Sequence, residues 1–478
     1  TRHTIGSGVQ GERIDPLTRR LLSIPGLSCY LDCSTSTLYA DFAVGDPRVG
    51  FMAARNSSAP GVHIAPDGRI ITETRSDVPL TVAGYWDATG FHRFHRPGWW
   101  VGTAATNYVL NSCFQLDTDG DGLGDSWTSS FGTNSLSQCP MSGGSCQRNE
   151  HTFTAEADRY TVAISHQTNN YTFDASSGPI SITLSFWARG DLSGLTTGID
   201  STSNRWVHIE GRQNDTSYTE TIVSRKLSEA TTDGLSSTAW RKFVFSAVIS
   251  NTATRKISIR FVFLGADTGL RPTTGESYWL EVTGVQVEKS PYATLHVPTT
   301  TAALTRPKDV VTMATAGNRN AAEETIIMQV TPWYSPSADM FSVHTLLDND
   351  NFGRKIDAYM FGAGDDSYLM CTPVYHPSWW GTTVSAGLGS YFTAYQPVTI
   401  GLVVRQSGTY AELYINGELV NSTTDAWQAE AWGAAMYMLS DHDGTNQFDG
   451  LLNAMTVHNR ALSAAEVAFV TNLLNGAA

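Results

Sequence analysis

The sequence predicts an all-β protein, with two antiparallel β-sandwiches in tandem after an irregular, β-rich N-terminal region. Short runs of alternating apolar and polar residues dominate the chain, such as 180–189, 241–249 and 398–406, and Gly, Asn, Asp, Ser and Pro residues bound them. Asn416-Gly417 separates two such runs, and this dipeptide is typical of a tight hairpin turn. Helical periodicity is almost absent before the C-terminus, which favours sandwiches or barrels.

Shifts in composition divide the chain into four segments. Residues 1–105 have patchy strand signals and end near a Trp- and His-rich stretch, so we expect an attachment or interaction region that folds against a partner. Residues 106–297 predict the first sandwich. Residues 298–309, rich in Thr and Pro, predict an extended linker, and residues 310–478 predict the second sandwich.

One helix is predicted, at the C-terminal end. Ser463 is the expected N-cap, and Glu466 three residues later completes a capping box. Val467, Val470 and Leu473 follow at helical spacing and form an apolar stripe, so this helix should pack on a sheet.

Charge and composition exclude several functions. The chain of 478 residues is 41% hydrophobic and has a net charge of −14, with no basic cluster. An acidic surface repels phosphate backbones, so we expect no nucleic-acid binding. No apolar run reaches the roughly 18 residues of a membrane span, so we expect no membrane insertion. Neutral glycans and cations remain plausible ligands.

An acidic, glycine-rich stretch at 117–125 is the most informative local feature. It places carboxylates at Asp117, Asp119, Asp121 and Asp125, and Leu123 offers a backbone carbonyl. Hard cations such as Ca²⁺ take several oxygen ligands, and four carboxylates this close repel one another without a cation. The stretch therefore predicts a structural calcium site. The alternative is an Asp- and Gly-rich surface turn without metal.

The same stretch resembles an EF-hand loop, with Gly122 in the sixth place. The twelfth place is Thr128 rather than a bidentate Glu, and no helical pattern flanks the loop. We therefore expect a calcium-stapled loop on a β-domain and not a calcium switch.

The six cysteines are too few for a disulfide scaffold. Cys139 and Cys146 bracket a flexible segment that a disulfide could close, whereas Cys113 and Cys371 are expected to be single buried thiols. Because the redox compartment decides the outcome, reduced thiols at 139 and 146 remain the alternative.

Exposed aromatic side chains could stack on sugar rings. The candidates for this role are Trp206, Trp333, Tyr334, Trp379, Trp380, Trp427 and Trp432. Each of them could instead fill a core or a protomer interface. Trp187 and Trp279 lie inside strand patterns and are assigned to the core, while Trp99 and Trp100 are expected to anchor the N-terminal region against a neighbour.

A second cation site is conceivable near the C-terminus, where acidic residues recur in two turns. These residues are Asp348, Asp350, Asp441, Asp443 and Asp449. The two groups would have to converge in space. The alternative is a set of solvated turn carboxylates.

Segments in three places resemble structural proteins of tailed phages. These segments are 63–80, 98–112 and 278–310, and together they span much of residues 60–310 in order. The chain departs from the family pattern at Trp99-Trp100, where the family has two Leu, and at Gly102-Thr103, where it has a Glu pair. The resemblance implies a virion protein, displayed on the particle surface and assembled in the host cytoplasm.

The two sandwiches each resemble a known class. The start at 111–127, the SFWARG run at 185–190 and a late strand after Trp240 are similar to family-4/9-like carbohydrate-binding modules. That resemblance implies a jelly-roll sandwich with a structural calcium, and it makes Glu288 an additional candidate ligand. Residues 412–420 and 448–467 are similar to laminin-G-like, concanavalin-type domains, which bind sugars, proteins or nothing.

Motifs for catalysis are missing from the sequence. There is no E-x-D-x-E run of glycosidase carboxylates, no G-x-S-x-G elbow and no H-E-x-x-H pair, so we expect no enzyme. The sequence favours a phage fibre, tail or head-decoration protein that forms a homo-oligomer, contacts other virion proteins and binds host glycans. The alternatives are a secreted bacterial adhesin or accessory glycan-binding protein, and a purely structural shell or filament subunit.

Overall fold

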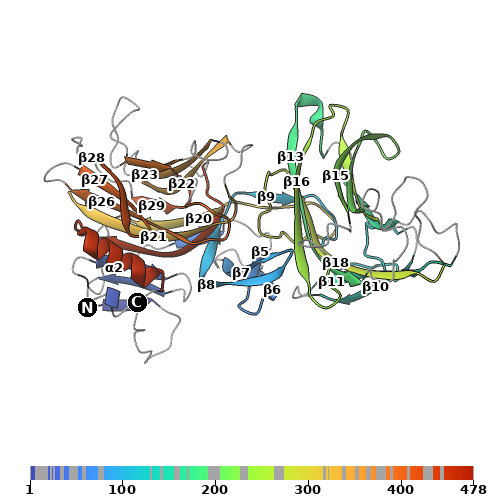
Figure 1. Cartoon of the computed structure of the whole chain (residues 1–478), viewed down its shortest axis with the longest axis horizontal. Coiled ribbons are helices and arrows are strands. Elements are labelled where there is room, and N and C mark those ends of the chain that lie inside the picture. Colours follow the sequence, from blue (N-terminus) through green and yellow to red (C-terminus); the bar gives the residue numbers. More distant parts are fainter. Residues whose placement is uncertain are drawn as a thin grey trace.

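The computed structural model consists of two β-sandwich lobes, with further strands lying between them (Figure 1). It confirms the all-β fold class. The structure describes residues 2–5, 20–21, 24, 27–32, 37–41, 52–55, 61–73, 80–129, 132–139, 144–154, 162–168, 172–191, 205–226, 235–262, 274–315, 319–320, 322–335, 341–349, 355–361, 368–372, 384–387, 391–405, 410–423, 434–441 and 446–476.

The first lobe is a sandwich of two antiparallel sheets. Among the described residues one sheet has five strands. Their order is β10 (Thr133–Gln138), β11 (Ser145–Thr152), β18 (Ser277–Glu288), β13 (Ile180–Asp191) and β16 (Arg241–Ile249). Its partner has the order β12 (Val162–Gln167), β17 (Lys256–Val262), β14 (Arg205–Arg212) and β15 (Tyr218–Lys226), and the short 3₁₀ helix η2 (Ala175–Ser177) precedes β13. Phe186, Phe243 and Phe261 meet between the sheets, because alternate residues of each strand point inward.

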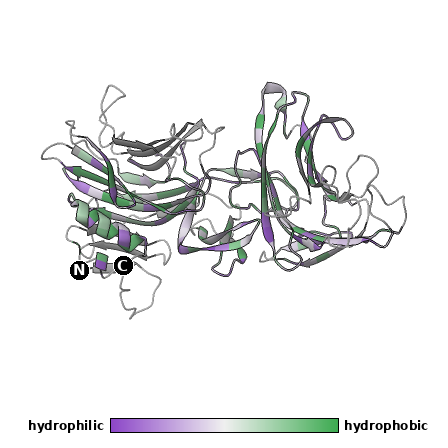
Figure 2. Ribbon diagram, in the orientation of Figure 1, coloured by the Kyte–Doolittle hydropathy of each residue, from purple (hydrophilic) through white to green (hydrophobic). Residues whose placement is uncertain are grey.

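The second lobe is a larger sandwich. Within the described residues, the strands of its first sheet have the order β28 (Glu418–Thr423), β27 (Tyr410–Ile415), β26 (Val398–Arg405), β21 (Glu324–Pro332), β30 (Gly450–His458), β8 (Gly90–Val101), β7 (Leu80–Asp87), β5 (Gly61–Ile64) and β6 (Ile70–Glu73). Three further strands extend this sheet from β30: β2 (Leu27–Asp32) pairs with β30, β3 (Thr37–Asp41) pairs with β2, and β1 (Arg2–Ile5) pairs with β3. The facing sheet runs β25 (Val384–Gly387), β24 (Tyr368–Thr372), β23 (Lys355–Phe361), β22 (Phe341–Asn349), β29 (Ala435–Met438), β20 (Asp309–Ala314) and β4 (Met52–Arg55). Figure 2 shows hydrophobic residues along the strands of both lobes.

The predicted C-terminal helix is confirmed as α2 (Ala464–Leu474). The Ser463 side chain accepts from the Glu466 amide, and the Glu466 side chain accepts from the Ser463 amide, which is the expected capping box. Val467, Val470 and Leu473 are buried against the large sheet, in a cluster that also includes residues of β21, β26 and β30.

The N-terminal region does not stand apart from the second sandwich. Its strand β2 pairs with residues 454–458 of β30, and β8 pairs with residues 450–452 of the same strand. The expected segment boundary near residue 105 therefore cuts through one hydrogen-bonded sheet. Trp99 and Trp100 are 5% and 2% exposed and pack within the chain itself, which differs from the expected contact with a neighbour.

Residues 298–309 also differ from the expected extended linker. Strand β19 (Leu304–Arg306) pairs with β9 (Ala105–Asn107) in a small separate sheet. Arg306 is 1% exposed, and its guanidinium donates to Asp309 at 2.6 Å. This segment is therefore packed within the protein instead of forming an extended linker.

The two lobes share an apolar junction. Trp187 and Leu295 of the first lobe belong to the same hydrophobic cluster as Val62, Trp99 and Trp333 of the second. Continuous apolar burial across a junction is typical of domains with a fixed relative position. Figure 1 draws β10, β11 and β18 in the first lobe, where they form one side of the five-stranded sheet.

Candidate functional site

A surface cleft of about 750 Å³ lies at the edge of the five-stranded sheet where β10 and β18 begin and β11 and β13 end. Strands β10, β11, β13 and β18 supply its wall, together with neighbouring residues. The lining residues are Gly132, Thr133, Glu150, His151, Thr152, Asp191, Ser277, Tyr278 and Trp279. The size lies within the range of about 300–1,000 Å³ that is usual for small-ligand sites.

A row of three side chains crosses the cleft. In the strand register Trp279 of β18 lies opposite Glu150 of β11 on one side and opposite Asp191 of β13 on the other. Residues opposite one another in an antiparallel pair project from the same face, with about 5 Å between their Cβ atoms. The register thus places a half-buried indole between two carboxylates.

The next row of the sheet supports the first. Glu281 lies opposite Arg148 and Arg189, and it accepts from Arg148 Nη1 at 3.2 Å and from Arg189 Nε at 2.5 Å. Arg148 also donates to Glu150 at 3.0 Å, and its guanidinium lies 4.5 Å from the centre of the Trp279 ring. These contacts fix both the indole and the Glu150 carboxylate, so the site is organised before a ligand arrives.

The cleft was not predicted, since the strand pattern assigns Trp279 to the core. The structure corrects this assignment, because Tyr278, Leu280 and Val282 are the core-facing residues and Trp279 shares the opposite face with Glu281. The sequence did contain a signal, because the polar residues Ser277, Glu281 and Thr283 share every second position with Trp279, whereas the alternate positions are the core-facing residues 278, 280 and 282.

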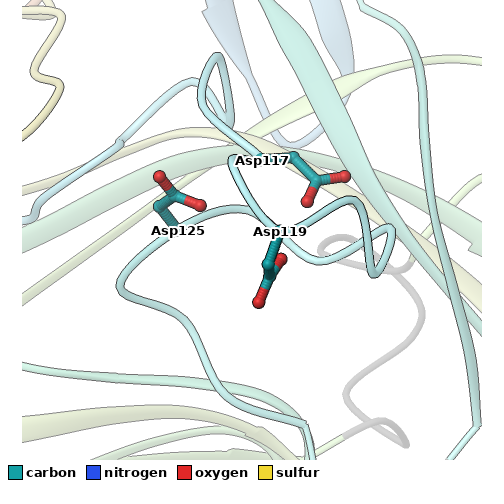
Figure 3. A group of neighbouring side chains, drawn as sticks. All are labelled: Asp117, Asp119 and Asp125. Atoms are coloured by element: carbon teal, nitrogen blue, oxygen red, sulfur yellow. The ribbon is translucent and has the colours of Figure 1, made fainter.

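The acidic loop forms a compact carboxylate group. One oxygen from each of Asp117, Asp119 and Asp125 lies within 4.8 Å of the others, and Figure 3 shows the three side chains around the turn of the loop. Asp121 does not join this group. Its carboxylate accepts instead from the Leu123 amide at 2.7 Å, and Leu123 itself is buried.

Backbone amides hold the loop in its turn. Asp117 accepts from the amides of Gly120 at 2.9 Å and Gly122 at 3.1 Å, and Asp125 accepts from Thr118 at 2.8 Å. Gly120 and Gly122 have φ values of 72° and 79°, a conformation that glycine adopts without strain. A carboxylate that accepts one such bond keeps further lone pairs, so these oxygens fit a hard cation such as Ca²⁺.

The loop is attached to the edge of the sheet that bears the cleft. The Gln147 side chain accepts from the Gly124 amide and donates to the Gly122 carbonyl, both at 2.8 Å. A Cβ on Gly122 would lie 2.5 Å from the Asn134 carbonyl of β10. Since β10 begins at Thr133, a residue that lines the cleft, the loop is packed beneath the cleft's rim.

Glu288 lies apart from the carboxylate group. It is 2% exposed and accepts from the Thr294 amide at 2.9 Å and from the Thr294 hydroxyl at 2.5 Å. Burial raises the pKa of this carboxyl above its usual value. The structure therefore gives Glu288 a local role in packing the chain after β18, and it does not support its expected place among the metal ligands.

Of the two alternatives for Cys139 and Cys146, the structure has no disulfide between them, and both residues are thiols. In the hairpin register Ser137 lies opposite Cys146, and Cys139 follows two positions later, just beyond the end of β10. The Cys146 sulfur instead contacts the Ser137 hydroxyl at 2.8 Å. Cys113 is buried as expected, and burial raises the pKa of its thiol to about 12.

The aromatic candidates of the second lobe do not form a platform among the described residues. Trp333 and Tyr334 are each 4% exposed. Trp333 meets the edge of Trp100 with 5.0 Å between ring centres, and Tyr334 stacks on Tyr292 at 4.4 Å, so both belong to the core. Five candidates lie outside the residues whose side chains are described: Trp206, Trp379, Trp380, Trp427 and Trp432.

The second predicted cation cluster is not assembled from the described residues. Asp441 accepts from the Asn446 side chain at 2.8 Å, whereas Asp449 accepts from the Thr103 amide at 2.7 Å and from the Tyr292 hydroxyl at 2.6 Å. Asp348 is buried at 2% exposure. Asp350 and Asp443 lie outside the described residues.

Comparison with known proteins confirms the fold class of the second lobe. Residues 333–468 match the family model described as the Concanavalin A-like lectin/glucanases superfamily. No curated protein matches the chain. The described part of the chain contains no helix that is both long and apolar enough to span a membrane.

Solved structures show only a distant likeness. The CBM40 of the Ruminococcus gnavus IT-sialidase, bound to alpha2,6 sialyllactose, is 19% identical with a TM-score of 0.25, and the match covers 32% of this chain and 84% of that one. The binding domain of botulinum neurotoxin serotype D is 12% identical with a TM-score of 0.28, covering 34% of this chain and 40% of that one. Likeness at this level carries no argument about ligands.

Proposed function

We propose that this chain is a non-enzymatic glycan-binding protein and that the cleft around Trp279 is its sugar site. The observation that carries the proposal is the row in which the Trp279 indole lies between the carboxylates of Glu150 and Asp191, at the wall of a cleft of about 750 Å³.

The chemistry of this row suits a sugar ring. A pyranose has an apolar face of C–H groups, which packs on an indole, and a rim of hydroxyls, which donate to carboxylates. Glu281 and Arg148 hold the indole and Glu150 in place, so little side-chain entropy is lost on binding. The absence of a paired general acid and nucleophile motif in the sequence supports binding without catalysis.

The acidic loop would supply a structural cation site beneath the cleft. Asp117, Asp119 and Asp125 would hold a Ca²⁺ ion, and the ion would neutralise three carboxylates that otherwise repel one another. Gln147 links the loop to β11, so a bound ion would stiffen the edge of the sheet that carries the cleft rim.

The biological setting that we propose is the surface of a tailed-phage particle, as a fibre, tail or head-decoration component. The resemblance of residues 63–80, 98–112 and 278–310 to tailed-phage structural proteins supports this setting. Display in several copies would suit a site of this kind, because multivalent attachment raises the overall affinity of weak sites. Antibody labelling of phage particles tests this surface location separately from glycan binding.

A glycan array with the purified full chain tests the binding site. We expect selective binding to some printed glycans, and Trp279→Ala should weaken it about tenfold or more because the stacking surface is removed. Tyr218→Ala removes an aromatic side chain that is 55% exposed on β15 of the other sheet, and it should leave binding unchanged. Binding that survives in Trp279→Ala, or release of sugar fragments from the array, would contradict the proposal.

A further inference from the structure

A small buried cavity lies at the junction of the two lobes. Trp187, Lys242 and His296 line it from the first lobe. Trp333 lines it from the second lobe, together with apolar side chains such as Val62. Its volume is about 10 Å³, which is close to the smallest that holds one water molecule or an ion of similar size. None of these residues lines the sugar cleft, so the cavity is a separate site.

Lys242 brings a positive charge into this cavity. The residue is 7% exposed, and its ammonium nitrogen lies 4.8 Å from the centre of the Trp187 ring. Among the described residues no carboxylate forms an ion pair with it, and Glu288 acts on it only through space. Burial lowers the pKa of Lys242 to about 8, so most of the amine is charged at neutral pH. The junction therefore holds a cation that has no counter-ion in contact, which is costly in a protein interior.

The other unsatisfied polar groups of the cavity are hydrogen-bond donors. The Nε1 atoms of Trp187 and Trp333 are buried and have no acceptor among the described residues. The Nε2 atom of His296 lies 3.2 Å from the Cys113 sulfur. Burial raises the pKa of the Cys113 thiol to about 12, so the thiol keeps a proton to share with Nε2. His296 then carries its own hydrogen on Nδ1, which has no partner in the described part of the chain.

We propose that this cavity binds a monatomic anion such as chloride. The four donor groups, one of them charged, need an acceptor, and a halide ion only accepts. A water molecule satisfies the set less well, because its own two hydrogens need acceptors that the described lining side chains do not supply. Since Lys242 belongs to the first lobe and Trp333 to the second, the anion also links the two lobes at their junction.

Thermal unfolding of the full chain in chloride-free buffer tests the site. Sodium chloride replaces sodium gluconate at constant ionic strength, because gluconate is too large for the cavity. We expect a saturable rise in Tm of about 3 °C at a chloride concentration about 100 times the Kd. A Tm that is the same in chloride and in gluconate would contradict the proposal.

Variants locate the effect at the cavity. Lys242→Met removes the charge, so its Tm should not respond to chloride, and in chloride-free buffer it should be at least as stable as the wild type. Trp187→Phe keeps an aromatic ring and removes the Nε1 donor, so the Kd for chloride should rise about tenfold. Lys289→Met is the matched control, because the exposed Lys289 ammonium lies 5.3 Å from the centre of the Tyr108 ring. A chloride response in Lys242→Met equal to that of the wild type and of Lys289→Met would overturn the proposal.

A crystal of the full chain soaked in bromide gives a readout that needs no variant. Bromide replaces chloride and scatters X-rays anomalously, whereas water does not. We expect an anomalous peak in the cavity, within hydrogen-bond distance of the Lys242 ammonium. Density for a water molecule there, with no anomalous peak at a saturating bromide concentration, would refute the anion site and leave the proposed sugar site untouched.

Discussion

Acid should destabilise this protein through histidines that the fold buries uncharged. His166 is 1% exposed, His296 is 2% exposed and His458 is fully buried. Burial lowers the pKa of His296 to about 3, with the nearby Lys242 charge adding to the effect, and lowers the pKa of His166 and of His458 to about 4. The Nδ1 atoms of all three have no hydrogen-bond partner among the described residues.

The sign follows from proton linkage. Each folded-state pKa is lower than the unfolded value of about 6.5, so the unfolded chain takes up protons first as the pH falls. Stability is therefore full above about pH 7 and declines as the pH falls toward the folded-state pKa. Between about pH 7.5 and pH 5, each histidine should lower the free energy of unfolding by about 2 kcal/mol, and the three together should lower it by about 6 kcal/mol.

Denaturant unfolding at the two pH values measures this loss. His166→Gln removes one titrating group and should reduce the loss by about 2 kcal/mol, since a neutral glutamine takes up no proton. His92→Gln is the control, because its side chain is 40% exposed. If the wild type and His166→Gln lose the same stability between the two pH values, the reasoning from burial is refuted.

Three further predictions follow from named groups. Calcium at a concentration about 100 times its Kd should stabilise the fold by about 2.7 kcal/mol, and this is measured as the rise in Tm over an EDTA-treated sample. Asp117→Asn should abolish the rise. An equal rise in the variant would exclude the acidic loop as the calcium site. Burial lowers the pKa of Lys242 to about 8, which is below its value in the unfolded chain. The charged lysine therefore destabilises the fold most below about pH 8, and this destabilisation decreases as the pH rises toward 10.5. Lys242→Met should therefore raise the free energy of unfolding at neutral pH by about 2 kcal/mol, and a loss of stability would show that the ammonium is needed. The hydrogen bond from Arg460 lowers the pKa of Glu466 to about 2, so its contribution is present above about pH 4.5 and is lost as the pH falls toward 2. The Glu466 side chain is 35% exposed, so solvent screening weakens this interaction. Glu466→Gln should therefore lower the free energy of unfolding by about 1 kcal/mol, measured by chemical denaturation at neutral pH. An unchanged free energy of unfolding would mean that the capping box contributes nothing.

Local signals in the sequence predicted local structure well. The capping box at Ser463 and Glu466 forms as expected. Asn416 and Gly417 adopt φ values of 53° and 87° between β27 and β28, as the hairpin signal requires. Such features depend on residues a few positions apart, so one sequence contains enough information to predict them.

Long-range pairing could not be predicted in the same way. Strand β30 pairs with β2 and β8, and both of these strands lie more than 300 residues before it in the chain. Nothing in the alternation of a single strand says which neighbour it will meet, so the sequence alone predicts an N-terminal region that folds against a partner. The Trp279 cleft was missed for a related reason, since its row is assembled from Glu150, Trp279 and Asp191 on three strands.

A crystal structure of the full chain with the tightest-binding oligosaccharide tests the central claim most directly. We expect a sugar ring packed on the Trp279 indole, with hydroxyls within hydrogen-bond distance of the carboxylates of Glu150 and Asp191. A sugar bound only to the second lobe, with the Trp279 cleft empty at a saturating concentration, would contradict the account.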